Sequence, residues 1–64
     1  MNEKQLISQS YEEVIKKLFA TFVDSWTDAK ITNNLQRVTD AESAYSKGLQ
    51  LRKDALAKAL SLTP

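Results

Sequence analysis

The sequence predicts an all-α protein, an antiparallel two-helix hairpin that completes a four-helix bundle by dimerisation. Apolar residues recur at steps of three and four through both halves of the chain. Glycine and proline occur once each, at Gly48 and Pro64, which leaves few residues that break helices. The 64 residues form a single domain (1–64) with no cysteine or histidine, so disulfides and common zinc sites cannot support so small a core. The remaining way to stabilise so small a core is oligomerisation or binding to a partner.

The first helix is expected at about residues 3–27. Asn2 suits the N-cap, with Gln5 three residues later as in a capping box. Successive residues of a helix are 100° apart, so the apolar residues from Ile7 to Trp26 fill an arc of roughly 180°, wider than one partner helix covers. They are Ile7, Tyr11, Val14, Ile15, Leu18, Phe19, Phe22, Val23 and Trp26.

The turn is expected at about residues 28–33. Thr, Asp and Asn crowd this stretch, and their side chains compete with helical hydrogen bonds. Asn33 or Asn34 can take the left-handed conformation of a tight connection, and Thr32 or Asn33 can cap the next helix. A later break stays open at Thr39, because residues 39–42 also read as a capping box.

The second helix is expected at about residues 33–61, with a stripe close to heptad spacing. Arg52 lies in that stripe, where a large apolar residue is expected. Its stem can pack while the guanidinium reaches water or a carboxylate, or it can be a buried polar residue that fixes register. Glu42 of a neighbouring chain is a candidate partner. The apolar stripe is Leu35, Val38, Ala41, Tyr45, Leu49, Leu56 and Ala59 or Leu60.

A second stripe on this helix consists of small residues. It suits two interpretations: high helix propensity on a half-exposed face, or a close contact between helices. The stripe comprises Ala41, Ala44, Gly48, Ala55 and Ala59.

Residue types argue against catalysis. Without His or Cys the ordinary nucleophile–base arrangements cannot form, and no glycine-rich phosphate loop is present. Asp24 and Asp28 offer far fewer oxygens than calcium requires. We therefore expect no enzyme, no cofactor and no metal site.

Charge argues against nucleic acid and membrane as partners. The net charge is +1, and the basic residues of the second half point around the helix among acids instead of forming one stripe. Glu12 and Glu13 disfavour an anionic lipid surface, and no apolar run approaches the ~20 residues of a membrane span. The N-terminus lacks the features of a secretory signal, so a cytoplasmic protein is expected.

The expected function is that of a small protein–protein interaction module, such as a regulatory adaptor, an inhibitor or a chaperone-like subunit. Its partner is a second copy, giving a homodimer, another protein, or both. Phe22, Val23 and Trp26 form the densest apolar patch. The candidate partner-binding residues are Tyr11, Phe19, Phe22, Val23, Trp26, Tyr45 and Arg52.

Two alternatives remain open. The expected architecture is similar to that of ROP-type dimeric hairpins, a likeness of architecture and not of residue motifs, and it implies a nucleic-acid-binding regulator. The other alternative is a subunit of a helical assembly or secretion apparatus.

Overall fold

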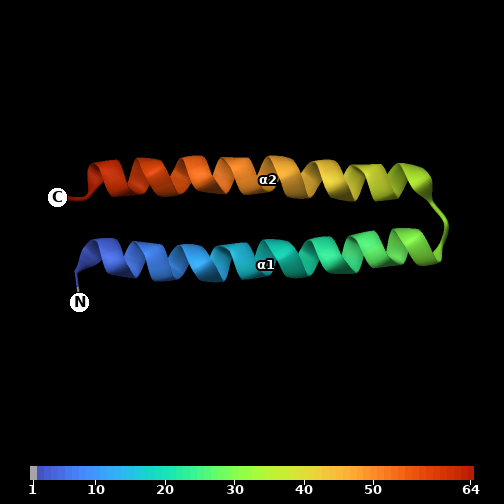
Figure 1. Ribbon diagram of the computed structural model, residues 1–64, viewed down its shortest axis with the longest axis horizontal. Coiled ribbons are helices and arrows are strands. Elements are labelled where there is room, and N and C mark those ends of the chain that lie inside the picture. The colour runs from blue at the N-terminus through green and yellow to red at the C-terminus, as the bar shows by residue number, and fades with distance from the viewer. Residues whose placement is uncertain (1) are drawn as a thin grey trace.

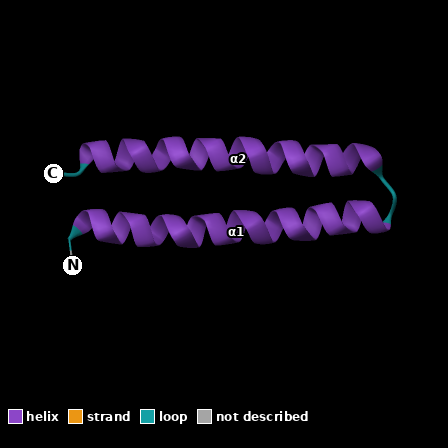
Figure 2. Ribbon diagram, in the orientation of Figure 1, coloured by secondary structure: helices purple, strands orange, loops and turns teal. Residues whose placement is uncertain are grey.

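The computed structural model describes residues 2–64 and consists of two antiparallel helices joined by a short turn. Helix α1 spans Glu3–Ile31 and helix α2 spans Leu35–Leu62, and no strand occurs in the described range. Both ends of the chain lie at one end of the hairpin and the turn lies at the other (Figures 1 and 2). The all-helical hairpin is confirmed. Met1, the first residue of the expected domain, lies outside the described residues.

Helix α1 begins with the capping box that the sequence indicates. The side-chain oxygen of Asn2 accepts a hydrogen bond of 2.8 Å from the backbone N–H of Gln5. The side-chain oxygen of Gln5 accepts one of 3.2 Å from the backbone N–H of Asn2. Two N–H groups that the helix leaves without partners are thereby satisfied.

Helix α1 ends later than expected, at Ile31 instead of about residue 27, so the expected turn at 28–33 is displaced toward 32–34. The side chain of Asp28 does not compete with the helix, because it has a partner beyond the turn. The carboxylate of Asp28 accepts a hydrogen bond of 2.8 Å from Arg37, beyond the turn. Ala29 is fully buried, so burial against α2 favours one further helical turn here.

The turn uses an expected residue for its left-handed position, but the expected cap of the next helix is wrong. Asn33 has a φ of 54°, in the left-handed region that Asn tolerates better than most residues. Asn34, and not Thr32 or Asn33, caps α2: its side chain accepts a hydrogen bond of 3.1 Å from the backbone N–H of Arg37. The hydroxyl of Thr32 instead donates to the carbonyl of Asp28, 3.0 Å away, at the end of α1.

Helix α2 is continuous, so the alternative break at Thr39 is wrong. The Thr39 hydroxyl donates a hydrogen bond of 3.2 Å to the carbonyl of Leu35 one turn earlier. This back-bonding occupies the side chain that would otherwise cap a new helix.

The hairpin is a single layer of helices, with Cα extents of 49 × 18 × 6 Å. Within residues 2–64 only Ala29 is buried, and the other residues of the seam between the helices are half-buried. Helical domains ordinarily enclose a core between two layers. This chain supplies one layer, and each of its two broad faces is open.

The two helices approach each other closely at Gly48. A Cβ atom built on Gly48 would lie 3.2 Å from Cδ1 of Leu18, tighter than most such contacts. The close-contact interpretation of the small-residue stripe therefore holds at Gly48, within one chain. Ala44 and Ala55 are exposed, which fits the helix-propensity interpretation.

Candidate functional site

One broad side of the hairpin carries a patch of large apolar side chains, which we call the aromatic face. On α1 it comprises Ile15, Phe19, Val23 and Trp26, whose spacing of three to four residues keeps them on one side of the helix. The indole N–H of Trp26 donates a hydrogen bond of 3.1 Å to the carboxylate of Glu42, which fixes the adjoining side of α2. Residues seven and eleven positions after Glu42 continue that side, so on α2 the face comprises Glu42, Leu49 and Lys53.

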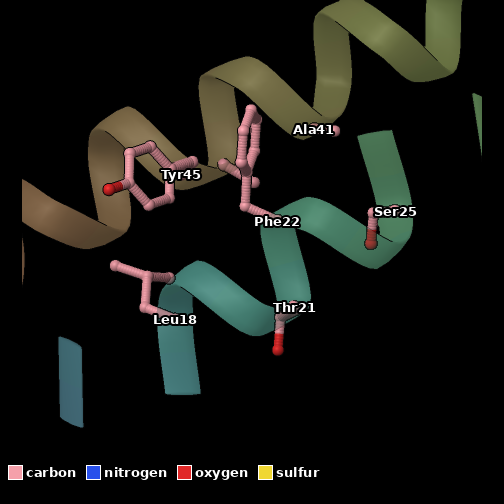
Figure 3. A pocket seen from close by; sticks show the side chains of 7 residues that line it. Leu18, Thr21, Phe22, Ser25, Ala41 and Tyr45 are labelled. Atoms are coloured by element: carbon pink, nitrogen blue, oxygen red, sulfur yellow. The ribbon is translucent and has the colours of Figure 1, made fainter. Parts of the chain in front are cut away.

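The opposite broad side holds a shallow, mostly apolar depression over the seam (Figure 3). The hydroxyls of Thr21 and Ser25 point away from α2 there, and the ring of Phe22 lies beside that of Tyr45. The depression is lined by Leu18, Thr21, Phe22, Ser25, Ala41, Ala44 and Tyr45.

The predicted aromatic residues divide between the seam and the aromatic face. Phe22 and Tyr45 stack across the seam, with ring centroids 4.7 Å apart and planes tilted by 39°. Tyr11 is half-buried in the same seam. Phe19 and Val23 point outward, with 54% and 40% of their surface exposed. Phe22 is therefore part of the hairpin's own packing, and Phe19 is the better candidate anchor for a partner.

Trp26 joins the seam to the aromatic face. Its ring centroid lies 6.4 Å from that of Phe22, and the side chain is half-buried. The ammonium nitrogen of Lys30 lies 5.2 Å from the centroid of the indole ring, within cation–π range. Together with the hydrogen bond to Glu42, these contacts hold the indole in one orientation at the edge of the face.

Arg52 is half-buried, and its guanidinium donates a hydrogen bond of 3.1 Å to the carbonyl of Gly48. Its stem lies among apolar side chains next to Val14 and Leu56. The packed stem matches the first interpretation of this residue, but the guanidinium meets a backbone carbonyl instead of a carboxylate. Glu42 is bonded to Trp26 within the chain, so a bond from Glu42 of another copy to Arg52 stays a prediction.

Sequence reasoning missed the α2 half of the aromatic face. Leu49 and Lys53 are absent from the candidate partner-binding residues, and Glu42 is named only as a partner for Arg52, although the spacing of seven and eleven residues is visible in the sequence. The sequence does not show that Glu42 is the hydrogen-bond partner of Trp26, because that pairing depends on the register between the two helices. Leu35, beside the turn, is also largely exposed.

The charged groups do not gather into a second kind of site. Arg37 is paired with Asp28, and Lys16 forms an ion pair of 3.2 Å with Glu13 one turn earlier. No cluster of three acidic side chains suited to a metal occurs within residues 2–64. Over the same part of the chain, neither helix combines the length and apolar character that crossing a bilayer requires.

Comparison with known proteins identifies no relative: no family model, curated protein or solved structure matches this chain.

Proposed function

We propose that this chain is a small non-enzymatic interaction module, such as an adaptor, an inhibitor or a chaperone-like subunit. The module binds another helical polypeptide through its aromatic face. Two further helices laid on that face would complete a four-helix bundle, and a second copy supplies two such helices. The observation that carries the proposal is the exposure of Phe19 and Val23 beside a half-buried Trp26.

The exposed apolar surface is large for so small a chain. Full burial of one large apolar side chain stabilises a protein by ~1.5–3 kcal/mol, and a domain's whole stability is only ~5–15 kcal/mol. A partner that covers part of this surface therefore adds stability comparable to that of the fold. Within residues 2–64, eight large apolar residues are exposed: Leu6, Val14, Phe19, Val23, Ile31, Leu35, Leu51 and Leu62.

The charge pattern favours a protein partner over nucleic acid. Binding to phosphates needs basic side chains that lie together on one side. Here Arg37 is held by Asp28, Lys30 lies over Trp26, and Arg52 is bonded to its own helix.

The test compares two variants that each place a carboxylate on an exposed apolar site. Phe19→Glu alters the aromatic face, and Leu51→Glu alters α2 away from it. The two sites are 54% and 58% exposed, so they are matched in burial. Phe22→Glu is unsuitable, because it would break the stack with Tyr45 inside the hairpin.

Each purified protein is measured by sedimentation equilibrium, and each serves as bait in a cross-linking pull-down. We expect Phe19→Glu to lose the association that wild type shows and Leu51→Glu to keep it. A stably folded wild-type monomer that captures nothing more than Phe19→Glu captures would overturn the proposal.

A further inference from the structure

We infer that the occupant of the aromatic face is a second copy of this chain, related by a two-fold axis that crosses the hairpin at the level of Phe19 and sets the two turns at opposite ends. This inference rests on the proposed function and makes it specific, because it names the partner, the register and the orientation. The carrying observation is that the residues of the face are arranged symmetrically about one level of the hairpin.

That level follows from contacts across the seam. Gly48 lies opposite Leu18, and the rings of Phe22 and Tyr45 are stacked. Since the helices are antiparallel, Phe19 is level with the midpoint between residues 47 and 48 of α2. We place a two-fold axis at this level, perpendicular to the helices and crossing both of them. It stacks α1 on α1 of the second copy and α2 on α2 of the second copy, each pair antiparallel.

On α1 the symmetry brings apolar residues together. Phe19 lies on the axis and meets Phe19 of the second copy. Ile15 lies four residues before Phe19, and Val23 lies four residues after it. Ile15 of one copy therefore lies opposite Val23 of the other copy. Offset or edge-to-face aromatic pairs of this kind are favourable at interface centres.

On α2 the same axis pairs opposite charges. The midpoint between Glu42 and Lys53 falls between residues 47 and 48, at the level of Phe19, so Glu42 of one copy faces Lys53 of the other. The exposed Leu35 and the half-buried Leu60 share that midpoint and pair in the same way. Because the axis relates the copies, each of these contacts occurs twice.

Two charged residues extend the face along α1, because Glu12 lies seven residues before Phe19 and Lys30 eleven residues after it, on the same side of the helix. Their charges also match. Glu12, seven residues before Phe19, faces Trp26 of the second copy, seven residues after Phe19. In each copy the ammonium nitrogen of Lys30 lies 5.2 Å from the centroid of that copy's own Trp26 ring. Lys30 is therefore close enough to pair with Glu12 of the other copy. Both acids of the face thus meet bases across the interface, as electrostatic complementarity requires.

The alternative two-fold axis, parallel to the helices, fits less well. It keeps both turns at one end and lays α1 of one copy over α2 of the other. Lys53 then lies near Glu12, but Glu42 and Lys30 are between five and six residues, about 8 Å, out of level with each other. In the antiparallel arrangement Glu42 is level with Lys53, and Glu12 is four residues, about 6 Å, from the level of Lys30, so both pairs fit at least as well.

The broad side of the hairpin that carries the aromatic face has the footprint that a stable dimer needs. The Cα extents of 49 and 18 Å give the whole side a footprint of about 880 Å². Standard specific interfaces bury about 800 Å² on each partner.

The first test is a charge exchange, read as the dimer dissociation constant by sedimentation equilibrium. Lys53→Glu sets two acids against each other at two sites, and we expect about tenfold weaker dimerisation. Glu42→Lys combined with Lys53→Glu restores opposite charges and should return the constant to within about threefold of wild type. Lys58→Glu, the matched control on the side of α2 away from the face, should change it little.

The second test reads the orientation. The chain has no cysteine, so Ser46→Cys and Ser61→Cys, both at exposed sites, can each carry a single spin label. In the antiparallel dimer the labels at 61 are about 40 Å apart along the bundle and those at 46 lie within one helical turn of each other. With both turns at one end, the two pairs of labels would show similar separations.

The results separate the inference from the proposed function. Similar label separations, or a Lys53→Glu variant that dimerises as tightly as wild type, would overturn the antiparallel dimer. A folded wild-type monomer would overturn it too, and the pull-down with Phe19→Glu would then decide on a different partner. Circular dichroism of every variant identifies a loss of helix, and Lys53→Glu with its Lys58→Glu control does not disturb the Trp26–Glu42 bond.

Discussion

Gly48 of α2 lies so close to Leu18 of α1 that little room is left for a side chain at position 48. A Cβ atom on Gly48 would lie 3.2 Å from Cδ1 of Leu18 and 2.9 Å from a guanidinium nitrogen of Arg52. Glycine inside a helix costs about 1 kcal/mol relative to alanine, so its presence mid-helix calls for a compensating contact. The close seam is that contact.

We predict that Gly48→Ala gains much less than the ~1 kcal/mol that helix propensity alone would give, because Leu18 and Arg52 must shift. Gly48→Val, which is larger, should destabilise the hairpin by ~1–3 kcal/mol. Urea unfolding at one fixed protein concentration measures both changes. Ala57→Gly, at an exposed site on α2, calibrates propensity at about 1 kcal/mol. A full gain from Gly48→Ala would show that the seam is looser than the structure has it.

The cap of α2 gives a second prediction. Asn34→Ala removes the acceptor of the Arg37 N–H and should cost ~1 kcal/mol of unfolding free energy, whereas Asn34→Asp keeps a capping oxygen and should cost far less. Thermal unfolding followed by circular dichroism compares the two variants. Equal losses would mean that Asn34 acts through something other than its cap.

A third prediction concerns the left-handed residue of the turn. Asn33→Gly should leave stability nearly unchanged or raise it, because glycine takes a φ of 54° without steric cost. Asn33→Val should lower it by ~1–2 kcal/mol, since a β-branched residue strongly disfavours that region. Urea midpoints measured side by side give the difference, and a tolerant Asn33→Val would place the turn elsewhere.

The hydrogen bond between Trp26 and Glu42 can be followed through the chain's single tryptophan. Glu42→Ala removes the acceptor and should shift the fluorescence emission to the red, with a loss of about 0.5–1.5 kcal/mol or less at this exposed position. Glu42→Gln retains a carbonyl acceptor and should keep the wild-type emission. Identical spectra for all three proteins would contradict an ordered indole.

The ion pair between Arg37 and Asp28 should contribute little. Both side chains are more than half exposed, at 52% and 57%, and exposed pairs give ~0–1 kcal/mol. Asp28 also lies near the C-terminal end of α1, where the helix dipole disfavours a negative charge. Asp28→Asn should therefore change stability by less than ~0.5 kcal/mol, and raising the salt concentration should shrink even that. A larger loss that persists at 1 M salt would reveal a structural role for the carboxylate.

How much the sequence could predict differs between the fold and the candidate site. Apolar spacing and the near absence of glycine and proline predict two long helices, and Asn2 with Gln5 predicts the start of the first. The end of α1 was placed about four residues early, because the stretch after Trp26 is rich in turn-forming types. Its helical state depends on the burial of Ala29 against α2, which is a contact between segments and not a local preference.

The sequence by itself determined that the chain is helical, that α1 carries more apolar surface than one helix can cover, and that the turn needs an asparagine. These properties follow from each residue's own conformational preference and from its position around a helix. Only the tertiary structure decided which aromatic residues face inward: Phe22 stacks on Tyr45, and Phe19, three residues away, is left in the open. That choice depends on the register between α1 and α2, which close packing at Gly48 sets.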